Sequence, residues 1–167
     1  MLALIRAGVF EEGGPEELLD GEIWVMPAEG ARHVDMKTWL NRQLVRSVGD
    51  DVSVTCDTTI RFSEAHWPDP DFALFPTSVR PSEARGPDML LVIEIADTSL
   101  TADLKIKGAK YQEYGVREYW VVDLEQRVTH VHKLGAGWPE APAIPFDAPV
   151  TPTPVSGVTL RLADCAL

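Results

Sequence analysis

Lys107 and Glu94 are charged residues at positions where the sequence predicts apolar ones. Lys107 lies in SLTADLKIKGAKYQEYGV (99–116), which reads as a helix that ends at Gly115. At helical spacing it shares an otherwise apolar face with Leu100, Leu104, Tyr111 and Tyr114. Glu94 interrupts the apolar run MLLVIEIA (89–96). Charges in surfaces that become buried cost free energy unless they pair or bind something, so the two residues indicate a site for a metal ion and a reacting anion.

Two further acidic residues could complete such a site. Asp71 opens the short apolar segment FALF (72–75), and Glu17 lies near the N-terminus. Carboxylates on neighbouring strands supply the hard oxygen ligands that Mg²⁺ and Mn²⁺ prefer. A lysine beside them could orient or deprotonate a water molecule, or stabilise charge that develops on phosphorus. These are the parts that metal-assisted phosphodiester hydrolysis needs.

Each candidate also has a purely structural interpretation. An acidic residue before a strand is often a turn or cap residue, which would explain Asp71 by itself. Asp69 competes with it for the same ligand role. A structural ion pair between Glu94 and Lys107 would explain both residues without catalysis, and the spacing alone leaves this alternative open.

The histidines and cysteines give weaker signals. His130 and His132 share a strand face and could bind a metal, but a third ligand is not evident and a solvent-facing pair is favoured. His33 opens a helix and is predicted to be an N-terminal or packing residue. Cys56 alternates inward on a strand and is predicted to be a core residue. The two cysteines of the chain are too few for a disulfide framework.

The order of predicted elements indicates one α/β domain, with a mixed sheet and helices on its faces. A helical turn is predicted at Pro15–Leu19. Helices are predicted over 33–49 and 99–116, and a strand–helix–strand unit over 89–123. Strands are predicted at 22–27, 52–62, 72–75, 89–96, 117–124 and 127–134. Residues 137–157 contain six prolines and are predicted to form an extended surface connection within a single domain of residues 1–167.

Composition limits the classes of function. The formal net charge of −11 argues against strong sequence-independent binding to nucleic acid, which rests on clustered Lys and Arg. It leaves room for a local basic patch, such as Lys37, Arg42 and Arg46 on one predicted helix, although an ordinary solvated face is favoured. No segment resembles a signal peptide or reaches the length of about 20 apolar residues that a membrane helix needs. We therefore expect a cytoplasmic protein that does not cross a membrane.

Several segments together resemble the Uma-two restriction-endonuclease family. They are PEELLDGEIWVM, His33, PDPDFALF, VIEIADTSLTADLKIKGAKYQEYGVREYWVVDL and VSGVTLRLAD. The densest match is D-x3-K-x3-Y-x3-G-V-x-E-Y-W, which begins at Asp103 and includes Lys107. This family belongs to the PD-(D/E)xK nuclease superfamily. The resemblance implies a restriction-endonuclease-like PD-(D/E)xK core, a mixed central β-sheet flanked by α-helices, and cleavage of DNA with Mg²⁺.

The resemblance also assigns roles by position. Pro70-Asp71 resembles the superfamily's PD, so Asp71 becomes the first metal ligand and is favoured over Asp69. Glu94 matches the second acidic position, and the backbone carbonyl of Ile95 is a further ligand. The superfamily's lysine normally follows two residues later, where this chain has Ala96, but in this family it comes from the next helix and matches Lys107. Glu17 resembles a glutamate that some members add to the metal shell.

The sequence thus predicts a Mg²⁺- or Mn²⁺-dependent endonuclease that hydrolyses DNA phosphodiester bonds with metal-activated water. The alternative from another class is a catalytically inactive nuclease-fold protein that serves in binding or assembly, which the acidic balance favours. A homodimer is compatible with cleavage of two strands, although no residue indicates it.

Overall fold

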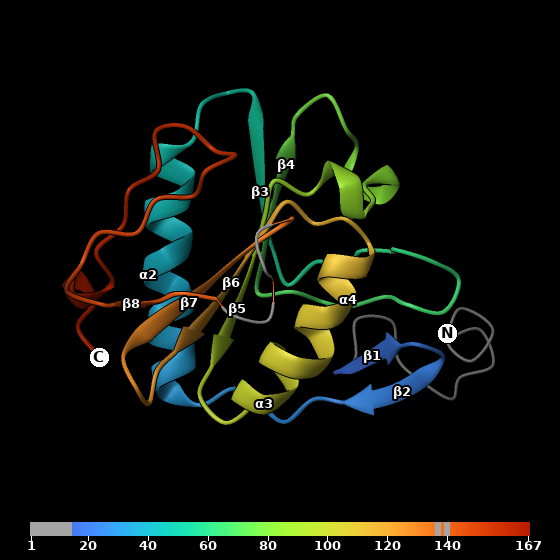
Figure 1. The fold of residues 1–167 in the computed structure, drawn as a ribbon, viewed down its shortest axis with the longest axis horizontal. Helices are drawn as coiled ribbons and strands as arrows, with labels where there is room; N and C mark the ends of the chain where they lie inside the picture. Colours follow the sequence, from blue (N-terminus) through green and yellow to red (C-terminus); the bar gives the residue numbers. More distant parts are fainter. Residues whose placement is uncertain (1–14, 136–137, 139–140) are drawn as a thin grey trace.

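A six-stranded mixed β-sheet forms the centre of the protein in a computed structural model, which describes residues 15–135, 138 and 141–167. The strand order is β3-β4-β5-β6-β7-β8, and only the central pair β5–β6 is parallel. The strands are β3 (Val52–Cys56), β4 (Phe72–Pro76), β5 (Leu91–Ala96), β6 (Glu118–Asp123), β7 (Val128–Lys133) and β8 (Ala143–Pro145). The predicted strand–helix–strand unit supplies the parallel pair, and the strands predicted at 117–124 and 127–134 form the antiparallel pair β6 and β7 (Figure 1).

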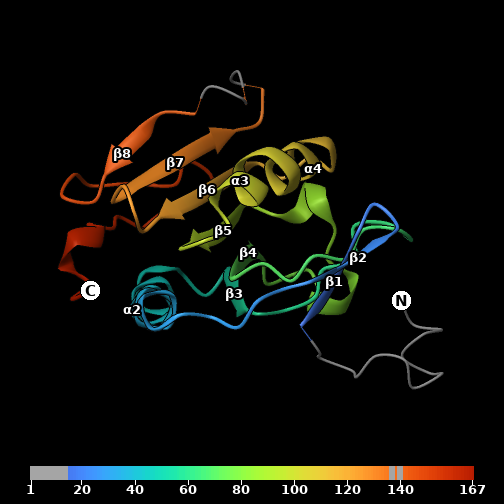
Figure 2. The ribbon, with the colours of Figure 1, turned by 90° about the horizontal axis from the view of Figure 1, so that it is seen from below.

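Helices cover both faces of the sheet, and Figure 2 shows the resulting layers. Helix α2 (Ala31–Ser47) lies on one face and buries Met36, Leu40 and Leu44, as the apolar spacing of this segment predicts. The second helical segment lies on the other face. Side chains of β5 alternate between the two layers: Ile93 packs in the core beneath α2, whereas Val92 packs in the core beneath the second segment.

The second helical segment contains a π-helical turn. It runs through α3 (Leu100–Ala102), the π turn η3 (Asp103–Lys107) and α4 (Gly108–Glu113). Gly115 follows with a φ of 80°, a conformation that glycine adopts without steric cost, so the helix ends where the sequence predicts. The wider i→i+5 turn was not predicted. Such turns are frequent at functional sites.

An antiparallel hairpin stands apart from the main sheet. It consists of β1 (Glu16–Leu19) and β2 (Glu22–Val25). The prediction of a helical turn at Pro15–Leu19 is therefore wrong. Asp20 and Gly21 both have positive φ, and an Asp-Gly pair in this conformation is the favoured two-residue hairpin turn. The hairpin reaches the rest of the fold through a β-bridge between Leu18 and Trp67.

Two other predicted segments differ from the structure. The predicted strand 52–62 ends at Cys56, because Asp57 adopts a φ of 48° and the chain leaves the sheet. In the Pro-rich segment, β8 pairs with β7 at the sheet edge, the place where a strand tolerates proline. Residues 137, 139 and 140 of that segment lie outside the described residues. Single 3₁₀ turns complete the secondary structure at η1 (Pro81–Glu83), η2 (Gly86–Asp88) and η4 (Leu162–Asp164).

The histidine pair on β7 was predicted to face solvent, and the structure contradicts this prediction. His132 is buried, its ring packs near Tyr119 and Trp138, and its Nδ1 lies 2.7 Å from the Trp138 carbonyl oxygen. Cys56 is half-buried and packs against the core, as predicted. The predicted absence of a signal peptide concerns residues outside those described. Among the described residues, no helix combines the length and hydrophobicity that crossing a bilayer requires.

Candidate active site

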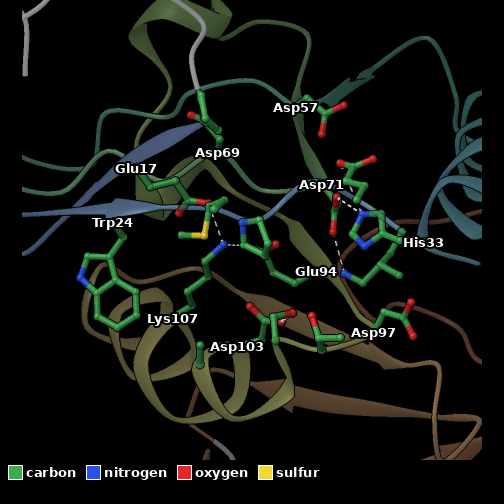
Figure 3. Close-up of a pocket in the computed structure, with 18 of the residues that line it drawn as sticks. Glu17, Trp24, His33, Asp57, Asp69, Asp71, Glu94, Asp97, Asp103 and Lys107 are labelled. Atoms are coloured by element: carbon green, nitrogen blue, oxygen red, sulfur yellow. Dashed lines mark hydrogen bonds and ion pairs between the residues drawn. The ribbon is translucent and has the colours of Figure 1, made fainter. Parts of the chain in front are cut away.

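One cavity of about 690 Å³ is lined by all four predicted site residues. Glu17 comes from β1, Asp71 from the residue before β4, Glu94 from β5 and Lys107 from the end of η3. Their exposed fractions are only 4–7%, so each charged side chain is nearly enclosed by protein. Figure 3 shows Glu17, Glu94 and Lys107 between the hairpin and the second helical segment, and Asp71 beside His33. Residues separated by as many as 90 positions thus share one enclosed, ionisable site.

The register of β4 and β5 explains why Asp71 and Glu94 are close. Phe72 pairs with Ile93, so continuing this antiparallel register by one residue places Asp71 opposite Glu94. The Glu94 side chain points to the face covered by the second helical segment, where it meets Lys107 and Tyr111, whereas the Asp71 carboxylate reaches His33 of α2. The Ile95 backbone N–H donates a 2.7 Å hydrogen bond to Asp71 Oδ2, which fixes this carboxylate against β5.

Lys107 joins two carboxylates from different elements. Its Nζ donates to Glu17 Oε1 at 2.9 Å and to Glu94 Oε1 at 3.1 Å. Burial alone would lower the pKa of Lys107, but Glu94, Glu17 and Asp103 outweigh burial and raise it above its usual value. Lys107 therefore keeps its proton at neutral pH. The ion pair that the sequence leaves open is present, and Glu17 is its second anionic partner.

Burial dominates the protonation of the acidic residues. It raises the pKa of Glu94 well above its usual value, and the opposing charge of Lys107 does not cancel this effect. The Tyr111 hydroxyl donates to Glu94 Oε1 at 2.8 Å. Burial also raises the pKa of Glu17, whose Oε2 is buried without a hydrogen-bond partner among the described residues. The site therefore holds more acidic groups than its lysine neutralises.

His33 is a site residue that the sequence analysis missed. It was predicted to be an N-terminal or packing residue, but its Nε2 lies 2.8 Å from Asp71 Oδ1. Burial lowers the pKa of His33, yet the hydrogen bond to Asp71 and the negative charges of Asp71 and Glu29 together outweigh burial and raise it. Lys37, one turn along α2, brings its Nζ to 3.5 Å from the same oxygen. The (i, i+4) spacing of a histidine and a lysine was the available signal.

A second group of potential metal ligands surrounds the same aspartate. One ligand atom each from Glu29, His33 and Asp71 lies within 4.8 Å of the other two. Lys37 also forms an ion pair with Glu29, so a protein cation already shares this position. Asp71 therefore lies between two sets of charged groups, with α2 on one side and Lys107 with Glu94 on the other.

Asp69, the competing candidate, lines the same cavity. Its Oδ1 is buried without a hydrogen-bond partner among the described residues, and burial raises its pKa. Asp71 is the residue that continues the β4–β5 register opposite Glu94, whereas Asp69 lies two residues earlier in the chain. The preference for Asp71 as the metal ligand stays a prediction.

Comparison with known proteins indicates the family and the fold in which this site occurs. The model of the Uma2 (Uma-two) family, described as "Putative restriction endonuclease", matches residues 3–163. The chain belongs to the Uma2 family. Among solved structures, this Uma2 chain is similar to a putative nuclease belonging to DUF820 from Anabaena variabilis ATCC 29413. The two share 18% sequence identity with a TM-score of 0.73, over 96% of this chain and 94% of the other.

The comparisons confirm the predicted family and fold class. The Anabaena structure supports a restriction-endonuclease-like fold for this Uma2 protein, and family membership supports a nuclease-like function. The type IIG restriction endonuclease BpuSI matches more weakly, with 15% identity and a TM-score of 0.41 over 65% of this chain and 12% of that one. The comparison with curated proteins gave no match.

Proposed function

We propose that residues 1–167 act as a single endonuclease domain that hydrolyses DNA phosphodiester bonds with a divalent metal ion. The observation that carries the proposal is the convergence of Glu17, Asp71, Glu94 and Lys107 on one enclosed cavity. Membership of the Uma2 family supports the same class of activity.

The residues of the cavity fit a hard divalent cation. Carboxylates are the ligands that Mg²⁺ and Mn²⁺ prefer, and an ionised carboxylate offers about four lone-pair sites. Asp71 uses two of its sites for Ile95 N–H and His33. The buried, unpartnered Oε2 of Glu17 lacks the cation or donor that such an atom normally has. Asp71, Glu94 and the Ile95 carbonyl would hold the metal, with Glu17 supporting the shell.

The protein groups then have separable roles. A bound Mg²⁺ or Mn²⁺ would supply Lewis-acid polarisation of the phosphoryl oxygens and a water of lowered pKa. Lys107, which keeps its proton, orients the attacking water and stabilises negative charge that develops on the phosphate. Glu17 and Glu94 hold the Lys107 ammonium in place through the two hydrogen bonds described above. Tyr111 fixes Glu94 in turn.

A direct test combines metal binding with cleavage. Calorimetric titration with Mn²⁺ is expected to give a binding signal that Asp71→Asn abolishes, and the wild-type protein is expected to cut DNA in Mg²⁺ or Mn²⁺. Asp147→Asn, which changes an exposed aspartate outside the cavity, is the control for charge removal. Binding or cleavage that is unchanged in Asp71→Asn would contradict the assignment.

The second candidate is an inactive nuclease-fold protein that serves in binding or assembly. One observation favours it: Lys107 already pairs with both Glu17 and Glu94, which is a self-contained ionic cluster. The absence of both Mn²⁺ binding and cleavage by the wild-type protein would support this candidate. A homodimer and a cytoplasmic location stay predictions, and sedimentation measurements test the first.

A further inference from the structure

The hairpin adds an apolar wall to the acidic cavity. Glu17 and Trp24 are direct cross-strand partners, so their side chains lie on the same face of the hairpin. The period of two along each strand adds Leu19 and Met26 to this face, and all four residues line the cavity. Ile106, from the helical segment, lines it as well. The carboxylate of Glu17 and the half-buried indole of Trp24 therefore face the same space (Figure 3).

The enclosed position of the charged residues limits what can reach them. Glu94 and Lys107 are 4% and 7% exposed, between the hairpin on one side and the helical segment on the other. A phosphodiester in a rigid duplex reaches groups this deep less readily than one in a flexible single strand, which proteins hold in grooves lined by aromatic side chains. The volume of about 690 Å³ falls within the range of small-ligand sites, roughly 300–1,000 Å³.

The charges around the cavity also disfavour a duplex. Eight acidic residues line it, whereas Lys107 is the single lysine and no arginine lines it among the described residues. A duplex would bring many phosphates near these carboxylates, which outnumber the cations that pair with them, Lys107, Lys37 and Arg32. A single phosphate placed beside Lys107 and a divalent cation would experience far less electrostatic repulsion than the many phosphates of a duplex.

We propose that this cavity takes one unpaired nucleotide of a single DNA strand, with its base against Trp24 and its phosphate at the Lys107 end. Aromatic side chains bind bases by stacking without regard to sequence, because every base has a π-face. Trp24 is thus a specificity residue that selects unpaired over paired DNA. The inference rests on the proposed nuclease function and adds the form of the substrate.

The test uses a single-stranded oligonucleotide that carries 2-aminopurine, mixed with protein and Mn²⁺ in a stopped-flow fluorimeter. Stacking on Trp24 is expected to quench the fluorescence before cleavage. Quenching should persist in Trp24→Phe, disappear in Trp24→Ala and remain in Val25→Ala. Val25 is the matched control, because it neighbours Trp24, is 68% exposed and does not line the cavity. Loss of one base–aromatic stack corresponds to roughly 5- to 150-fold weaker binding.

Cleavage rates separate this inference from the proposed function. The single strand is expected to be cut at least about 10-fold faster than the same sequence in a duplex, and Trp24→Ala should reduce that preference. Equal rates on both forms, or quenching that Trp24→Ala leaves intact, would overturn the role of Trp24 while the nuclease assignment stands. No cleavage of either form, together with no Mn²⁺ binding, would overturn both.

Discussion

Asp71, the residue before β4, lies opposite Glu94 within β5, one residue beyond the antiparallel Phe72–Ile93 pair. Their mutual repulsion contributes to the raised pKa of Glu94, although burial is the larger cause. The sheet therefore places two anions side by side, and a cation must lie near them for both to be ionised. In the structure, Lys107 supplies that cation to Glu94.

Lys107→Ala should destabilise the metal-free protein. Removing the ammonium leaves Glu17 and Glu94 buried without their cation, and breaking a buried ion pair in this way costs about 3–5 kcal/mol. Urea unfolding measures the loss. Lys105→Ala, an exposed lysine two residues away, should change stability by less than about 0.5 kcal/mol. Equal effects of the two substitutions would contradict the ion-pair cluster.

Cleavage gives a second, independent measurement on the same pair of variants. Because Lys107 is proposed to stabilise charge on the phosphate, Lys107→Ala should abolish cleavage even under conditions where it remains folded. Lys105→Ala should cut at the wild-type rate. A folded Lys107→Ala protein that still cleaves DNA at the wild-type rate would remove Lys107 from the mechanism.

Glu17→Gln should weaken metal binding. The substitution removes the charge of a buried carboxylate whose Oε2 has no hydrogen-bond partner among the described residues, and loss of such a supporting group typically lowers metal affinity about 10- to 100-fold. Glu16→Gln is the matched control, because the adjacent side chain points to the other face of the hairpin. Calorimetry with Mn²⁺ distinguishes them, and identical affinities would exclude Glu17 from the shell.

Tyr111→Phe should destabilise the protein more than Tyr114→Phe. The Tyr111 hydroxyl is fully buried and donates to Glu94, so its removal leaves a buried carboxylate oxygen with one donor fewer, at a cost of about 1–3 kcal/mol. The Tyr114 hydroxyl bonds to Ser63 in a half-buried setting, where about 0.5–1.5 kcal/mol is expected. Denaturant unfolding of the two variants compares these values, and a reversed order would contradict the role of Tyr111.

The metal-free protein should lose stability as pH rises above the ordinary pKa values of glutamate and histidine, 4.5 and 6.5. Burial raises the pKa of Glu94 above 4.5, and Asp71 and Glu29 together raise that of His33 above 6.5 despite burial. The folded form therefore binds more protons than the unfolded form, so stability falls as pH rises through the folded-state pKa values. Metal ligands must be deprotonated, so the stabilisation by Mg²⁺ should grow with pH. Thermal unfolding with and without Mg²⁺ measures both trends, and parallel curves would count against metal binding here.

Periodicity predicted the central part of the site because Lys107 and Glu94 violate strong local patterns. A cation on an apolar helix face and an anion in an apolar strand are visible without tertiary information. The contact between His33 and Asp71 joins residues 38 positions apart, and a histidine in the first turn of a helix violates no local rule. The sequence pattern around His33 therefore could not reveal its contact with Asp71.

The hairpin shows a different limit of the sequence. The sequence predicted the strand β2 but not β1, whose four residues are too few for a period of two to be separated from a helical turn. The Asp20-Gly21 pair was the decisive signal, since it favours a two-residue turn between strands. Trp24 became a candidate only once pairing placed it beside Glu17.

Because of the π turn at Asp103–Lys107, the direction of the Lys107 side chain depends on the number of residues in the helical segment before it as well as on residue type. A π turn carries one residue more than the α-turn it replaces. Because residues advance by about 100° along an α-helix, deleting one residue from the helical segment without relaxation of the π turn would rotate Lys107 by about that angle. The lysine would survive in the sequence and point elsewhere. In Uma2 proteins, a preserved lysine is therefore informative only when its spacing from the preceding strand is preserved with it.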